Sequence, residues 1–157
     1  MCLDQQGMDI SVIVPGRLAV GSGIWTLEAM TELARQGYTH IVDLQAEFDD
    51  SELGATVGLE VLWNPTDDDF TAKPPEFFER SARFALAALD QPAACIYVHC
   101  AAGIHRGPLT MAAILIALGH RLDEALTLVE SRRAGADFPE VYTDSLRLWA
   151  ENRRFQE

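Results

Sequence analysis

The run Ile96–Pro108 constrains the fold of this chain more than any other stretch. It passes from an apolar, β-rich segment through a turn that contains Gly103 into an apolar helical stretch that opens near Pro108. A strand, a tight loop and a helix in this order direct the loop amides and the helix N-terminus toward one point. The sequence therefore predicts an anion-binding loop between a buried strand and a central helix.

Two functional side chains occupy the ends of this loop. Cys100 opens it, and Arg106 follows after five intervening residues. Cysteines at helix N-termini or beside cations have pKa values of roughly 3.5–7.5 instead of about 8.5, so we expect a thiolate at Cys100. The planar guanidinium of Arg106 matches two oxygens of a phosphoryl group. A nucleophile and a clamp are thus predicted to converge on one phosphate.

The composition favours a single soluble domain. The chain has 157 residues, of which 48% are hydrophobic and 23% charged, which is enough for a full core. We expect a flexible lead-in over residues 1–8 and one domain over 9–157. No window approaches the 18 or so apolar residues of a membrane span, and the N-terminus does not resemble a secretory leader. These features predict a cytoplasmic protein with no membrane partner.

Charge and cysteine content exclude several classes of protein. A formal net charge of -12 has the wrong sign for nucleic acid or an anionic membrane surface, so no nucleic-acid partner is expected. Three cysteines are too few for a disulfide framework, and no Cys-x2-Cys pair indicates zinc. The spacing of His99, Cys100 and His105 matches no common metal site. We expect neither a metal nor a cofactor.

The periodicity of the chain predicts alternating strands and helices. Apolar, β-branched runs at 10–14, 18–20, 39–44, 59–63 and 95–98 are typical of strands. Helical patterns cover 26–36, 76–89, 108–118, 123–132 and 140–152. The predicted fold is an α/β single-domain sandwich with a central, mainly parallel sheet flanked by helices on both faces. The acidic segment 47–52 between two strands is interpreted as a solvated loop.

The pattern His99-Cys100-x5-Arg106 resembles the phosphate loop of the Cys-based protein tyrosine phosphatases, and the short chain is similar to their dual-specificity branch. The resemblance extends roughly from Gly16 to Trp149. It implies a dual-specificity phosphatase-like catalytic domain that hydrolyses phosphate monoesters without metal, through a phosphocysteine intermediate. His99 would support the loop. The phosphate would be bound by Ala101, Ala102, Gly103, Ile104, His105 and Arg106.

The same resemblance implies a general acid on a loop about thirty residues before the cysteine. Asp67, Asp68 and Asp69 are the candidates in this sequence. The run Asp69-Phe70-Thr71 resembles the acid loop of the phosphatidylglycerophosphate phosphatases, whereas aligning the following helix start with other dual-specificity members favours Asp68. Our prediction from the sequence is Asp69, with Asp68 as the alternative.

Gly107 departs from the resembling family, which usually has Ser or Thr after the arginine. That hydroxyl helps the thiolate leave, so we expect slow hydrolysis of the phosphoenzyme. The loop lacks the lysines of phosphoinositide-directed relatives, and the expected substrate is a protein phosphorylated on Tyr, Ser or Thr, or a small soluble phosphoester. The alternatives are a catalytically weak phosphoresidue-binding module, a loop-Cys sulfurtransferase and an arsenate reductase. The last two do not require the acid loop and the distant arginine together.

Overall fold

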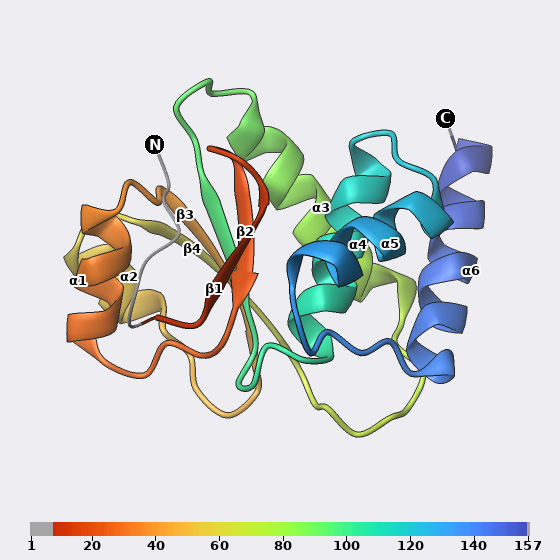
Figure 1. The fold of residues 1–157 in the computed structure, drawn as a ribbon, viewed down its shortest axis with the longest axis horizontal. Helices are drawn as coiled ribbons and strands as arrows, with labels where there is room; N and C mark the ends of the chain where they lie inside the picture. The colour runs from red at the N-terminus through yellow and green to blue at the C-terminus, as the bar shows by residue number, and fades with distance from the viewer. Residues whose placement is uncertain (1–7, 157) are drawn as a thin grey trace.

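A five-stranded sheet separates two helical layers in the computed structural model, which describes residues 8–156 (Figure 1). Except for Met8, the expected lead-in over residues 1–8 lies outside the described residues. The strand order is β1-β2-β5-β3-β4. The strands are β1 (Ile10–Val14), β2 (Leu18–Gly21), β3 (His40–Gln45), β4 (Glu60–Thr66) and β5 (Ile96–His99). The helices are α1 (Leu27–Arg35), α2 (Ser51–Thr56), α3 (Pro75–Leu89), α4 (Arg106–Ala117), α5 (Leu122–Arg132) and α6 (Glu140–Gln156).

The sheet is mainly parallel, as predicted. Strands β2, β5, β3 and β4 pair in parallel, and β1 pairs with β2 in antiparallel orientation through a short turn. The carboxyl ends of parallel strands meet at one edge of a sheet, where open α/β folds bind ligands. Strand β5 lies at the centre of this arrangement, so the loop that follows it is supported from both sides.

Two hydrophobic cores hold the layers together. Helices α1 and α2 cover one face, where Met30 and Leu33 pack with Ile41 and Tyr97 of the sheet. Helices α3 to α6 cover the other face (Figure 1), where the apolar helix α4 is buried along most of its length. A helix that is apolar nearly all round requires partners on all sides. Its central position fixes Arg106, the first residue of α4, beside the sheet.

Local signals explain several of the helix boundaries. Thr26 caps α1, since its hydroxyl accepts a hydrogen bond from the backbone N–H of Ala29 at 3.2 Å. Gly37 follows that helix with a φ of 99°, and Gly119 follows α4 with a φ of 111°. The interpretation of 47–52 as a solvated loop was wrong in part: Glu47 and Asp49 are exposed in a loop, but the side chain of Asp50 is fully buried and α2 begins at Ser51.

Candidate active site

The phosphate loop connects the end of β5 to the start of α4 and encloses the thiol. Cys100 is 2% exposed, and its Sγ accepts hydrogen bonds from the backbone N–H groups of Gly103 at 3.2 Å and Gly107 at 3.3 Å. Two amide donors on one sulfur stabilise negative charge there. The predicted anion-binding turn is therefore closed around the predicted nucleophile.

Gly103 has a structural role in this loop. Its φ is 71°, and an added Cβ would lie 2.8 Å from the carbonyl oxygen of Gly21. A side chain at this position is excluded on both grounds. The loop is also tied to its neighbour by the backbone N–H of Gly23, which donates to the carbonyl of Ala101 at 2.9 Å.

The remaining loop amides are available to an anion. Within residues 8–156, the backbone N–H groups of Ala101, Ala102, Ile104 and His105 donate no hydrogen bond to another residue. They belong to the same short turn as the sulfur. An array of such donors beside a helix N-terminus is the arrangement that proteins use to bind phosphate.

Arg106 is held from one side by a carboxylate. Its two terminal nitrogens donate to the two oxygens of Glu47 at 2.7 and 2.9 Å, and Nη1 also donates to the carbonyl of Thr66 at 2.9 Å. The hydrogen bonds from Arg106 lower the pKa of Glu47 to about 2. The guanidinium is 4% exposed, and its Nε–H is buried without a partner among the described residues. This orphaned donor fits an oxyanion ligand.

The three candidate acids differ in where their carboxylates lie. One oxygen of Asp68 is 2.9 Å from Nδ1 of His105, and the other accepts a hydrogen bond from the Tyr142 hydroxyl at 2.9 Å. Asp68 also interacts electrostatically with Arg106. The structure therefore brings Asp68 to the rim of the phosphate loop.

Asp69 is engaged elsewhere. Its carboxylate accepts hydrogen bonds from the backbone and hydroxyl of Thr71 and from Nζ of Lys73, and these contacts lower its pKa to about 2. Lys73 also donates to the carbonyl oxygen of Asp67 at 2.6 Å. The backbone turns at the next residue, Phe70, which has a φ of 58°. The adjacent carboxylates of Asp68 and Asp69 thus bind different neighbours.

Aromatic side chains complete the rim beside Asp68. The ring of Phe70 is 54% exposed and stacks on Tyr142 with centroids 5.8 Å apart. Phe70 also meets the ring of His105 edge to face at 5.2 Å. The second ring nitrogen of His105, Nε2, lies 3.1 Å from a carboxylate oxygen of Asp137. His105 thus bridges the acid loop and the segment that follows α5.

Glu47 and Arg133 support the loop, and the sequence did not predict this role for either of them. Glu47 was assigned to a solvated segment, although it lies two residues beyond β3, at the carboxyl edge where ligand sites form. Arg133 is 4% exposed and donates from Nε to the carbonyl of Gly103 at 2.7 Å, while its terminal nitrogens bind Asp9 at 2.9 Å. No feature of the sequence distinguishes this arginine from its neighbour Arg132.

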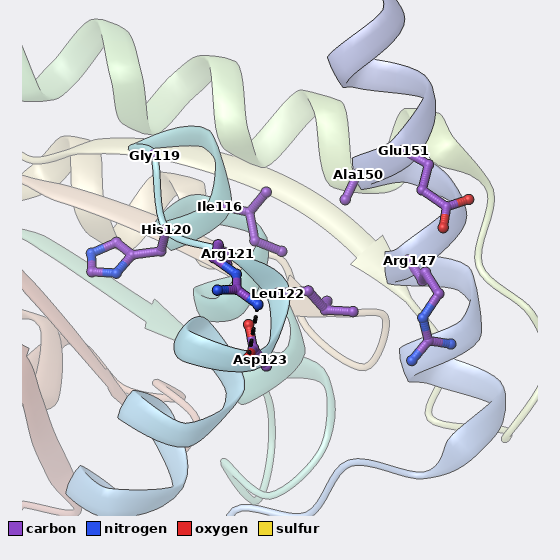
Figure 2. Close-up of a pocket in the computed structure, with 9 residues that line it drawn as sticks. All are labelled: Ile116, Gly119, His120, Arg121, Leu122, Asp123, Arg147, Ala150 and Glu151. Atoms are coloured by element: carbon purple, nitrogen blue, oxygen red, sulfur yellow. Dashed lines mark hydrogen bonds and ion pairs between the residues drawn. The ribbon is translucent and has the colours of Figure 1, made fainter.

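A separate pocket of about 640 Å³ lies at the other end of α4 (Figure 2). It is bounded by the turn from Gly119 to Asp123 and by α6, and charged side chains from both elements surround an apolar floor. No lining residue belongs to the phosphate loop or the acid loop. This pocket is not part of the site built around Cys100.

Comparison with known proteins agrees with this geometry. The dual specificity phosphatase catalytic domain family matches residues 24–152, and the chain belongs to that family. Protein tyrosine phosphatase type IVA 2 of Mus musculus is 32% identical over 115 residues, which cover 71% of this chain and 67% of the mouse protein. PRL-1 phosphatase of Drosophila melanogaster is 37% identical over 69 residues, covering 40% of this chain and 39% of the fly protein. The protein is a Cys-dependent phosphatase.

Solved structures show the same fold. Tk-PTP in its active form is 25% identical with a TM-score of 0.79, over 93% of this chain and 99% of that one. PTPMT1 in complex with PI(5)P, at 19% identity and a TM-score of 0.79 over 90% and 94% of the two chains, shares the fold. Within residues 8–156, no helix is both long enough and apolar enough to cross a bilayer.

Proposed function

We propose that this protein hydrolyses phosphate monoesters through a phosphocysteine intermediate, with Cys100 as nucleophile, Arg106 and the loop amides as the phosphate site, and Asp68 as general acid. The observation that carries the proposal is the closed loop itself. The Cys100 sulfur receives two backbone hydrogen bonds, and the orphaned Nε–H of Arg106 lies on the same turn. Oxyanion donors placed in advance around a nucleophile are the main source of catalysis in phosphoryl transfer.

In the first step the Cys100 thiolate forms a bond to phosphorus, and the bond from phosphorus to the ester oxygen breaks. Asp68 donates a proton to that leaving oxygen. In the second step Asp68 takes a proton from water, the resulting hydroxide attacks phosphorus, and the thiolate leaves with release of inorganic phosphate. Arg106 and the loop amides bind the equatorial oxygens throughout, and no metal takes part.

The choice of Asp68 over Asp69 rests on placement. Asp68 is oriented at the loop rim by His105 and Tyr142, whereas Asp69 binds Lys73 and Thr71. The contacts with His105 and Tyr142 fix the orientation of the Asp68 carboxylate at the rim, and a fixed orientation is what proton transfer to a leaving oxygen requires.

We further propose a phosphorylated protein as substrate, with a small soluble phosphoester as the second candidate. Two related proteins, from mouse and fly, are described as phosphatases, and the mouse protein as a protein tyrosine phosphatase. The exposed ring of Phe70 at the rim offers an apolar contact for a substrate side chain. The loop residues Ala101, Ala102 and Ile104 contain no lysine for a multiply charged lipid headgroup.

The test is hydrolysis of an aryl phosphate from pH 4 to 8 in the presence of EDTA. We expect turnover by the wild-type protein, none by Cys100→Ser, and a covalent adduct of one phosphoryl group by intact mass after a rapid acid quench. Wild-type protein that binds vanadate but neither turns over nor forms the adduct would identify a phosphoresidue-binding module. Activity that depends on an added thiosulfate or arsenate would instead identify a sulfurtransferase or an arsenate reductase.

A further inference from the structure

Three ionisable side chains lie buried beside the phosphate loop, and the mechanism proposed above uses none of them. Asp43 on β3 and His99 on β5 are direct partners in the parallel register, and Asp50 is the N-cap residue of α2. All three side chains are 0% exposed. Burial of ionisable groups is costly unless their contacts compensate, and such groups concentrate at functional sites.

The three side chains form an ordered chain of contacts. The carboxylate of Asp43 accepts hydrogen bonds from the backbone N–H groups of Gln45 at 2.8 Å and Asp50 at 3.1 Å. It therefore closes the segment 45–50 into a loop. Within that loop, Oδ2 of Asp50 lies 2.8 Å from Nε2 of His99, while Oδ1 of Asp43 lies 3.7 Å from the same nitrogen. His99 is joined to Cys100 by a single peptide bond.

The geometry is that of a hydrogen bond and not of a metal site. One potential ligand atom from each of Asp43, Asp50 and His99 lies within 4.8 Å of the others. A tetrahedral zinc ion with bonds of about 2.0 Å keeps neighbouring ligand atoms about 3.3 Å apart. The 2.8 Å between His99 and Asp50 is shorter than that and is the usual length of a charge-assisted hydrogen bond.

The pKa values of the three side chains agree with a hydrogen bond from a neutral His99 to an ionised Asp50. Burial raises the pKa of Asp43 to about 7 and that of Asp50 to about 6, and it lowers the pKa of His99 to about 4. His99 is therefore neutral near pH 7, and the contact with Asp50 assigns its proton to Nε2. The charge of Asp43 raises the pKa of His99, and the charge of Arg106 lowers it. An interaction of the His99 ring with the backbone of Cys100 opposes the effect of burial and raises the pKa of His99.

The loop 45–50 contacts both ends of the phosphate loop. Asp50 binds His99, immediately before Cys100, and Glu47 binds Arg106 with both carboxylate oxygens. We propose that Asp50 is a positioning residue that holds His99 and thereby fixes the strand end from which Cys100 enters the phosphate loop. Asp43 holds Asp50 in place for this purpose. The kinetic consequence rests on the proposed phosphatase function, while the effect on the thiol does not.

The experiment compares Asp50→Ala, Asp50→Asn and the matched control Glu52→Ala, which removes an exposed carboxylate two residues away. The rate at which iodoacetamide alkylates Cys100 is measured from pH 4 to 9, together with kcat/KM against pH and the melting temperature. Asp50→Ala should lower kcat/KM by about tenfold, because a buried donor loses its acceptor, and should displace the midpoint of the alkylation profile. Asp50→Asn keeps an acceptor oxygen and should restore most of kcat/KM, and Glu52→Ala should match the wild type.

A folded Asp50→Ala protein with wild-type alkylation and kcat/KM would overturn the proposal, even if its melting temperature fell. The ¹⁵N NMR spectrum of His99 in the wild-type protein is a second measurement that needs no variant to fold. The proposal requires the tautomer protonated at Nε2 near pH 7, and the opposite tautomer refutes it. If the wild type proves inactive as a phosphatase while alkylation still depends on Asp50, the proposed function fails and the positioning role stands.

Discussion

Replacement of Asp68 by Ala tests the assignment of the general acid. A positioned acid contributes about 10²–10⁴-fold, which equals about 2.7–5.4 kcal/mol of activation free energy. The benefit depends on the leaving group, because a stable phenoxide needs no proton. Asp68→Ala should therefore lower kcat/KM, which reports the step in which the leaving group departs, by at least about 100-fold for phenyl phosphate and far less for p-nitrophenyl phosphate. The fall in rate at high pH should also disappear.

Asp69→Ala is the matched control, since it removes the adjacent carboxylate. Asp69 is exposed, and Lys73 keeps its hydrogen bond to the carbonyl of Asp67 when the Asp69 carboxylate is removed. We expect Asp69→Ala to retain the wild-type pH profile and the same ratio of rates for the two substrates. The reasoning is refuted if Asp69→Ala shows the leaving-group effect and Asp68→Ala does not. Steady-state kinetics of both variants on the two substrates decides the question.

Three further predictions concern the surroundings of the loop. A Cβ at position 107 would lie 3.5 Å from Sγ of Cys100, so Gly107→Ser should place a hydroxyl at the sulfur and Gly107→Ala should not. The wild-type protein should show a burst in rapid-mixing traces, and Gly107→Ser should raise kcat and abolish that burst. Arg133→Met should lower the free energy of unfolding by about 2 kcal/mol and reduce kcat/KM, because a buried charged hydrogen bond is lost. Arg132→Met, at the exposed neighbour, should change neither quantity; urea titrations and rate assays measure the two effects. The raised pKa of Asp50 means that the folded protein binds more protons than the unfolded chain between about pH 4 and 6, so its contribution to stability falls as the pH rises through that range. Asp50→Asn should remove this decline. Urea midpoints that are equal for variant and wild type at pH 4 and at pH 6 would contradict the raised pKa of Asp50.

The fold and the centre of the site were predictable because their signals are local. The strand, turn and helix around Cys100 are contiguous in the sequence, and the buried strands read as apolar runs. Helix α2 was missed since it has only six residues and lies in an acidic stretch. The sequence pattern of 47–52 did not reveal that Asp50 is buried, because the side chains that bury it come from β3 and β5, which lie elsewhere in the sequence.

The supporting residues were less accessible to sequence reasoning. Glu47 and Arg133 reach the loop from points 59 and 30 residues away from the loop residues they bind. The order of the parallel strands brings Glu47 there, and that order is a property of the folded sheet. The choice between Asp68 and Asp69 depends on tertiary contacts, because His105 and Tyr142, which bind Asp68, lie 37 and 74 residues away from it in the sequence.

The contact between Asp68 and Tyr142 has a consequence for the order in which the site forms during synthesis. Domains begin to fold while the chain is still being made, from the N-terminal end. Cys100 and Arg106 are both present once α4 has been made, but Tyr142 belongs to α6, which follows α5. In a chain interrupted after α5, Asp68 lacks one of its two hydrogen-bond partners. Under the proposed mechanism, activity toward substrates with poor leaving groups therefore reports that the chain has been made through α6 and has folded.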